Sequence, residues 1–194
     1  MESSTQAIGQ TGKILKKNLI EASLFLIWME SLPVKHKILV AGNHDTSVEK
    51  RLINPKDYNI TYLEHESIEI ECIKFFGSPY TPHFNDWAFN VSRHKLQPYW
   101  DEMPMDTDVL ITHGPPKGIL DIADHEEGME YCGDKSLLNK VLEVKPKYHI
   151  FGHIHPKEHI NQGTHTYQGI NFMNASCLID GANKLTSFGY IIEI

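Results

Sequence analysis

Residues 38–45, ILVAGNHD, join a short apolar run to a polar tetrapeptide. An apolar run that ends at a glycine is typical of a buried strand, so residues 36–41 are predicted to form a strand that ends at this tetrapeptide. Asn43, His44 and Asp45 would then lie where open α/β sheets bind their ligands. An amide oxygen and an imidazole can ligate a metal, and a carboxylate can fix the tautomer of a neighbouring histidine. Because Asn and Asp after glycine are also ordinary turn residues, the tetrapeptide alone leaves a turn and a ligand loop equally open.

The same arrangement occurs twice more along the chain. The apolar strand predicted at residues 106–112 leads into HGPP at residues 113–116, and the strand predicted at residues 148–151 leads into GHIH at residues 152–155. A lone histidine at a strand end is usually structural, but three Gly/His clusters at one topological position are difficult to produce by chance. Imidazoles with an amide oxygen suit Mn, Fe or Zn better than Ca or Mg. The sequence therefore predicts a divalent-metal site at these strand ends.

Composition limits the class of protein. The chain has 194 residues, of which 41% are hydrophobic, as expected for one globular domain. Its net charge of −7 and the absence of a basic run disfavour binding to a nucleic-acid backbone. Three cysteines without a C-x-x-C pair favour a reducing compartment. The longest apolar run, residues 22–29, is too short for a membrane span and no signal peptide is recognised, so we expect a cytoplasmic protein without membrane contact.

The remaining pattern predicts a flexible segment at residues 1–12 followed by one domain at residues 13–194. A helix is expected from Lys13 until Pro33 stops it, and a second, short helix is expected behind a capping box of Thr46 and Glu49. The aromatic segment 84–100 is interpreted as a surface-packing cluster of helix and loop in preference to a base-stacking site, and the acidic segment 121–134 as solvated. The other expected elements are strands at 59–63, 166–173 and 188–194, a hairpin at 67–76 that turns near Glu71 and Cys72, and a helix at 135–142 capped by Asp134.

The three motifs, in this order, resemble the second half of the signature of calcineurin-like metallophosphoesterases: DxH, GD, GNH[DE], a later His and GHxH. Longer segments extend the resemblance over residues 28–176. They are WMESLPVKHKILVAGNHD, FFGSPYTPHFNDWAF, LITHGPPKGILD and FGHIHPKEHI, which resemble the metallophosphoesterase-domain-containing branch, similar to class III cyclic-nucleotide phosphodiesterases. The resemblance implies an α/β fold of the αββα sandwich type.

The resemblance also implies roles for individual residues. The implied metal ligands are Asn43, His113 and His153 for the second ion and His155 for the first. His44 would contact the phosphate and assist the leaving oxygen, and Asp45 would orient its ring. The implied reaction is hydrolysis of a phosphoester, of the phosphodiesterase type, by in-line attack of a metal-bound hydroxide. The substrate would be a small phosphoester, with a nucleotide as one candidate.

The chain departs from the family pattern at its N-terminal side. No aspartate precedes Asp45 and no histidine precedes His36, so the DxH and GD motifs are absent and the sandwich is expected to be N-terminally truncated, without its first strands. Two dications about 3.5 Å apart repel by roughly 19 kcal/mol at an effective dielectric near 20, and neutral ligands do not offset that repulsion. We therefore expect one ion rather than two and impaired activity. A carboxylate supplied by Asp121, Asp124 or Glu126 is the less favoured alternative to a solvated acidic loop.

Two other functions remain open at this point. One is a catalytically silent phosphoesterase-like protein that binds a metal, a nucleotide or a partner. The other is a mononuclear metal hydrolase on an unrelated fold, which predicts that the GNHD tetrapeptide lies away from His153. The sequence makes no prediction of the oligomeric state.

Overall fold

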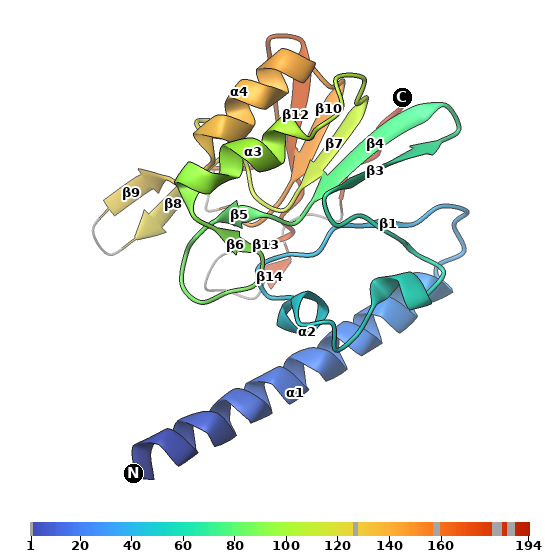
Figure 1. Cartoon of the computed structure of the whole chain (residues 1–194). Helices are drawn as coiled ribbons and strands as arrows, with labels where there is room; N and C mark the ends of the chain where they lie inside the picture. The colour runs from blue at the N-terminus through green and yellow to red at the C-terminus, as the bar shows by residue number, and fades with distance from the viewer. Residues whose placement is uncertain (1, 126–127, 157–159, 180–183, 186–188) are drawn as a thin grey trace.

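A six-stranded mixed sheet forms the centre of the protein (Figure 1). The computed structural model describes residues 2–125, 128–156, 160–179, 184–185 and 189–194. The strands of this sheet are β3 Glu66–Ile70, β4 Ile73–Ser78, β7 Val109–Thr112, β10 Tyr148–Phe151, β11 Thr164–Tyr167 and β12 Ile170–Asn174. Their order is β11-β12-β10-β7-β4-β3; neighbours among β12, β10, β7 and β4 are parallel, and β11 and β3 run antiparallel to their neighbours. This confirms the predicted α/β class.

The inner strands explain why two of the predicted clusters meet. Val109 and Leu110 of β7 are buried, as expected for a parallel strand covered on both faces. In the register of the sheet, Ile150 of β10 pairs with Ile111 of β7. Because neighbouring parallel strands end at the same edge, the loops that follow β7 and β10 emerge beside each other.

Two helices cover one face of the sheet: α3 (Leu96–Asp101) and α4 (Lys135–Val144) (Figure 1). Asp134 caps α4 as predicted, because its carboxylate accepts the backbone N–H of Leu137 at 2.7 Å. The same carboxylate accepts the indole N–H of Trp100 at 2.9 Å, which joins the two helices. Fully buried side chains between the helices and the sheet are Leu96, Trp100, Leu110, Val141 and Phe172. The second half of the aromatic segment thus contains a helix, as expected, but Leu96 and Trp100 lie in the core rather than in a surface cluster.

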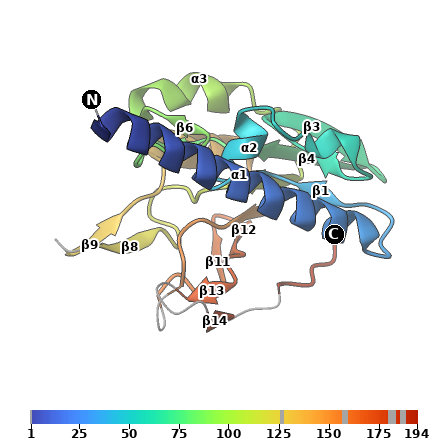
Figure 2. The ribbon, with the colours of Figure 1, turned by 90° about the horizontal axis from the view of Figure 1, so that it is seen from below.

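A long helix, α1 (Glu2–Ser31), runs along the lower end of the molecule in Figure 1, below α2 (Thr46–Glu49) and β1 (Ile38–Leu39). In the view from below it passes in front of α2, which it contacts (Figure 2). Leu26 is buried against the body, whereas Trp28 is 56% exposed. The helix begins at Glu2 rather than at Lys13, so the prediction that it starts after residue 12 was wrong.

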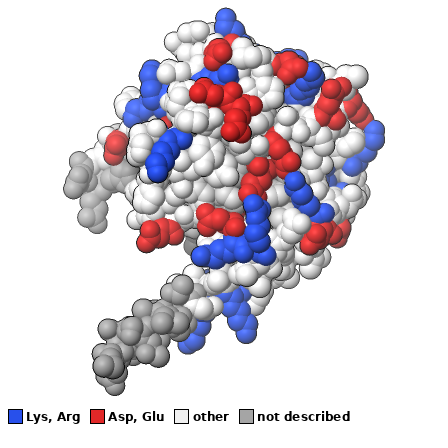
Figure 3. All heavy atoms as spheres, viewed as in Figure 1, with Lys and Arg blue, Asp and Glu red and all other residues white. Residues whose placement is uncertain are grey.

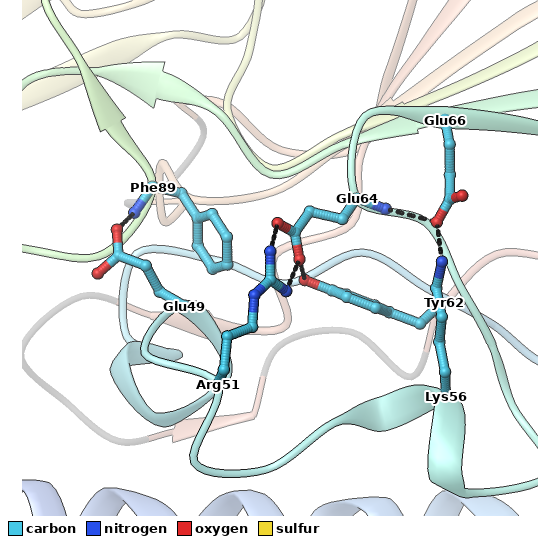
Figure 4. Close-up of polar contacts among 7 residues, drawn as sticks. All are labelled: Glu49, Arg51, Lys56, Tyr62, Glu64, Glu66 and Phe89. Atoms are coloured by element: carbon cyan, nitrogen blue, oxygen red, sulfur yellow. Dashed lines mark hydrogen bonds and ion pairs between the residues drawn. The ribbon is translucent and has the colours of Figure 1, made fainter.

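A smaller parallel pair is formed by β1 and β2 (Thr61–Tyr62). A polar network fixes the segment between these two strands (Figure 4). Arg51 donates two hydrogen bonds to Glu64 at 2.5 and 2.6 Å, and the Tyr62 hydroxyl donates to the same carboxylate at 2.9 Å. Burial and this carboxylate raise the pKa of Tyr62, so its hydroxyl stays protonated as a donor.

The shorter elements lie in the connections. They are η1 Pro55–Asp57, β5 Thr81–Pro82, β6 Asn90–Val91, η2 Arg93–Lys95, β8 Ile122–His125, β9 Gly128–Tyr131, β13 Leu178–Ile179 and β14 Lys184–Leu185. The predicted hairpin turn is confirmed, with positive φ at Glu71 and Cys72. The strand predicted at 188–194 was wrong for residues 189–194, which are irregular, and residue 188 lies outside the described residues. Among the described residues, none of the helices is long and apolar enough to cross a membrane.

Candidate active site

The GNHD tetrapeptide forms a closed turn at the start of α2. The backbone N–H of Gly42 donates to the Asp45 carboxylate at 2.6 Å, and the Asp45 N–H donates back to the Gly42 carbonyl at 2.9 Å. Burial raises the pKa of Asp45, against the opposing effects of the Gly42 N–H and of His44. Asp45 therefore closes the turn through these two hydrogen bonds, and its role in orienting the His44 ring remains a prediction.

The predicted capping box does not cap α2. Asp45 is the N-cap residue, and Glu49 instead accepts the backbone N–H of Phe89 at 2.7 Å (Figure 4). The cap is supplied by Asn18 of α1, whose side chain accepts the N–H of Ser47 at 2.8 Å and donates to the His44 carbonyl at 2.5 Å. The capping-box prediction was wrong because the Glu49 carboxylate accepts a hydrogen bond from a distant backbone N–H instead of one at the start of the helix.

The three motifs converge on one point. The ring nitrogen Nε2 of His113 lies 2.7 Å from Oδ1 of Asn43, and the ring centroids of His113 and His153 are 4.7 Å apart. The backbone N–H of Gly152 donates to the His113 carbonyl at 3.0 Å, which ties the second motif to the third. His153 has a φ of 69°, a left-handed conformation that is uncommon for a residue with a side chain.

Gly42 is required by this packing. A Cβ placed on Gly42 would lie 2.4 Å from Cε1 of His113, a distance that real side chains do not tolerate. The backbone of the first motif therefore touches the imidazole of the second, which explains a glycine at this position of the tetrapeptide.

The electrostatics favour neutral imidazoles at this point. Burial, followed by the neighbouring rings of His153 and His44, lowers the pKa of His113 to about 3. Burial, His44 and His155 lower the pKa of His153 to about 4. Both rings are consequently uncharged near neutral pH and keep a nitrogen lone pair that can bind a cation.

These side chains line a cavity of about 670 Å³, a volume suited to a small-molecule ligand. Of the six predicted site residues, five lie in its wall: Asn43, His44, His113, His153 and His155. Asp45 lies behind the wall in the closed turn. Because the tetrapeptide and His153 share the cavity, the alternative that places them apart is contradicted.

The donor chemistry fits a divalent ion. Asn43, His113 and His153 offer one amide oxygen and two neutral imidazoles, which suit a borderline cation. Within the described residues, no group of three or more His, Cys, Asp or Glu side chains is already arranged to hold a metal ion. Among the described residues that line the cavity, Glu130 is the single carboxylate.

The acidic segment is solvated in part only: Gly128–Tyr131 is exposed, as predicted, whereas Asp121 and Asp134 are buried. Asp121 is fully buried, and its Oδ2 accepts the N–H groups of Gly118 and Gly133, each at 2.9 Å. It is therefore a structural carboxylate rather than a solvated one or a substitute metal ligand. Glu126 and the side chain of Asp124 lie outside the described residues.

Other residues at the cavity were not predicted. Phe84 and Trp87 lie in its wall, and Trp87 contacts His44 with ring centroids 4.9 Å apart. Arg93 also lines the cavity and donates to the carbonyls of Cys132 and Gly133 at 2.8 and 2.9 Å. The aromatic composition of residues 84–100 was the one sequence signal for the two rings.

Comparison with known proteins agrees with this geometry. The family profile of calcineurin-like phosphoesterases matches residues 12–157, and the chain belongs to this family. Members of the family use divalent metals for phosphoester hydrolysis. The match spans all three motifs, so the fold and the cavity belong to a metallophosphoesterase.

Individual relatives within this family are about one third identical to the chain in sequence. Metallophosphoesterase domain-containing protein 1 of Homo sapiens is 33% identical over 175 residues, which cover 76% of this chain and 53% of that protein. A UPF0046 protein of Caenorhabditis elegans is 36% identical over 165 residues, which cover 76% of this chain and 54% of that protein. The chain thus spans about half the length of these relatives. One crystal structure aligns with 85% of this chain and 65% of its own at a TM-score of 0.59 and 18% identity, which supports the fold alone.

Proposed function

We propose that this chain hydrolyses small phosphoesters, with phosphodiesters as the preferred type, in the cavity beside the three motifs. One observation carries the proposal: His113 lies 2.7 Å from Asn43, 70 residues earlier in the chain, and its ring is 4.7 Å from that of His153. Neutral histidines gathered in a cavity of ligand size are the arrangement that metal-assisted hydrolysis requires.

In this proposal Asn43, His113 and His153 hold one Mn, Fe or Zn ion. Such an ion polarises phosphoryl oxygens and lowers the pKa of a bound water. His44 lies in the same wall, where its imidazole can contact the phosphate and give a proton to the leaving oxygen. The other donor side chains among the described residues of the wall are those of His83, Glu130, Cys132 and His155. Since Glu130 is the one carboxylate in this set, we propose single-ion occupancy and reduced activity.

Hydrolysis of bis(4-nitrophenyl) phosphate with added Mn²⁺ tests the proposal. We expect metal-dependent release of nitrophenol that falls at least about 100-fold in His113→Ala, as for the loss of an electrostatic catalytic contact. His165→Ala, an exposed histidine on β11, is the matched control and should keep the wild-type rate. An unchanged rate in folded His113→Ala would refute the assignment.

A second candidate function is binding of a metal or nucleotide without turnover. The observation in its favour is that the described residues of the cavity wall offer neutral metal ligands and one carboxylate, that of Glu130. Binding of Mn²⁺ and a mononucleotide by wild-type protein that shows no hydrolysis would establish this candidate instead.

We further propose a cytoplasmic protein whose partners are small phosphoesters rather than nucleic acids or membranes. Cys72 is an exposed free thiol, which fits a reducing compartment. Figure 3 shows acidic and basic side chains interspersed over one face, without an extended basic surface on it. Thiol titration of protein purified without reductant checks the compartment, since a disulfide at Cys72 would oppose it.

A further inference from the structure

We propose that Phe84 and Trp87 form a binding site for a flat aromatic ring, so that the substrate is a phosphoester that carries such a ring. The inference rests on the proposed function, because the phosphate has to lie at the histidines. The two side chains are large, apolar and solvent-exposed, at 47% and 36% of their surface. Both line the cavity that holds the three motifs.

The two rings and His44 form a continuous aromatic surface. The ring centroids of Phe84 and Trp87 are 5.3 Å apart with the planes at 74°, an edge-to-face contact. On its other side Trp87 contacts His44, at 4.9 Å between centroids and 46° between planes. A ligand whose phosphate meets His44 would therefore place its next group beside the Trp87 indole.

The loop that carries these rings is built into the site. The backbone N–H of Ala88, next to Trp87, donates to the carbonyl of Asn43 at 3.0 Å. The backbone N–H of Phe89 donates to Glu49 of α2 at 2.7 Å (Figure 4). Two hydrogen bonds thus attach the loop directly to the GNHD turn and its helix, which fixes Trp87 relative to the predicted metal ligands.

The other end of the loop is also fixed. The side-chain amide of Asn90 donates to the carbonyls of Phe84 and Asn85 at 3.1 and 2.8 Å. Asn85 adopts a φ of 54°, a left-handed conformation that asparagine tolerates. A loop held at both ends presents its rings without a large ordering cost on binding, which is the property expected of a preorganised subsite.

The chemistry of the wall favours a flat ring over an aliphatic chain. Stacking on an exposed indole needs a π face, and it tolerates different bases because every base has one. Ile122, Met129 and Ile160 add apolar surface to the same cavity, and a thioether packs well against an aromatic ligand. The shared chemistry is therefore a flat aromatic group on the esterified part of the substrate, either a nucleobase joined through its sugar or a simple aryl group.

Calorimetric titration of the Mn²⁺-supplemented full chain tests this inference. The probes are hydrolysis-resistant phosphonates: the analogue of adenosine 5′-monophosphate, the analogue of ribose 5-phosphate, and benzylphosphonate. We expect the adenosine analogue to bind at least about tenfold more tightly than the ribose analogue, as for one stacked base. In Trp87→Ala the affinities for the adenosine and ribose analogues should differ by no more than about twofold, and the ribose analogue should bind as it does to wild type. Trp87→Phe should keep most of the preference for the adenosine analogue.

Trp28→Ala provides the matched control, because Trp28 is an exposed tryptophan on α1 outside the cavity wall. Benzylphosphonate distinguishes the two sources of the ring: binding as tight as that of the adenosine analogue supports an aryl site, and weaker binding supports a nucleobase site. Equal binding of the adenosine and ribose analogues to wild type, a ratio unchanged in Trp87→Ala, or no binding of any probe would overturn the inference.

The outcome is separable from that of the proposed function. A chain that prefers the ring-bearing phosphonate but does not hydrolyse phosphodiesters would refute the hydrolase and leave the ring site standing. Metal-dependent hydrolysis without any ring preference would give the reverse result.

Discussion

Asn18 of α1 caps a different helix, α2. Its side-chain oxygen accepts the backbone N–H of Ser47, 29 residues further along the chain, at 2.8 Å. The same amide donates to the carbonyl of His44 at 2.5 Å. One side chain of α1 therefore satisfies backbone groups on both sides of Asp45, and the first helix becomes part of the support of the candidate site.

Replacing Asn18 should loosen the GNHD turn. Asn18→Ala removes both hydrogen bonds and should lower the free energy of unfolding by about 1 kcal/mol, as for the loss of a helix cap. Asn18→Asp keeps an acceptor for Ser47 and should lose less. Urea denaturation measures the stability and amide hydrogen exchange at Ser47 measures the cap. Unchanged exchange at Ser47 in Asn18→Ala would show that the contact contributes nothing.

Gly42→Ala should displace His113. The added Cβ would lie 2.4 Å from the imidazole, and an overpacked contact of this kind typically costs about 1–3 kcal/mol of stability. Mn²⁺ affinity should fall together with stability, measured by calorimetry and by urea denaturation. Gly12→Ala is the control, because a Cβ on Gly12 meets nothing within 4 Å and alanine favours its helix. A Gly42→Ala variant that behaves like Gly12→Ala would contradict the packing.

Lowering the pH should destabilise the protein because His149 on β10 would have to be protonated. Its side chain is fully buried, and its Nε2 lies 2.8 Å from the Thr112 hydroxyl. Burial lowers the pKa of His149 to about 3, from an ordinary value of 6.5. The unfolded chain therefore binds this proton more readily than the folded one. Stability should fall as the pH falls from about 6.5 toward 3, by up to about 1.4 kcal/mol per pH unit from this residue.

His149→Gln separates this contribution from the others. Urea midpoints between pH 7.5 and pH 5 should fall less steeply in His149→Gln than in wild type, although the variant is less stable at pH 7.5. His165→Gln, at an exposed position of β11, should keep the wild-type slope. Parallel pH profiles for His149→Gln and wild type would contradict the prediction.

The sequence predicted the elements whose signals are local. The apolar runs of β7 and β10, the turn at Glu71 and Cys72 and the cap at Asp134 depend on neighbouring residues, and the structure has all of them. The proximity of the second and third motifs also followed from local patterns, since the parallel strands β7 and β10 end at one edge of the sheet. The first motif follows β1, which belongs to the separate pair with β2, so its approach to the other two did not follow from this rule.

Long-range partners decided the features that the sequence missed. Glu49 has the spacing from Thr46 that a capping box requires, but its carboxylate accepts the backbone N–H of Phe89, 40 residues away. Asp121 lies in a segment of solvated composition, yet the N–H groups of Gly118 and Gly133 stabilise it in the interior. No local pattern marks Asn18 as a cap or separates Trp87, at the cavity, from Trp100, in the core.

The central claim is that Asn43, His113 and His153 bind one divalent ion at the meeting point of the three motifs. Calorimetric titration of the metal-free chain with Mn²⁺ tests it most directly, with His153→Ala as the variant and His165→Ala as the control. We predict one ion per wild-type chain, an affinity at least about tenfold weaker in His153→Ala, and wild-type binding in the control. Equal Mn²⁺ affinity in wild type and in folded His153→Ala would contradict the account.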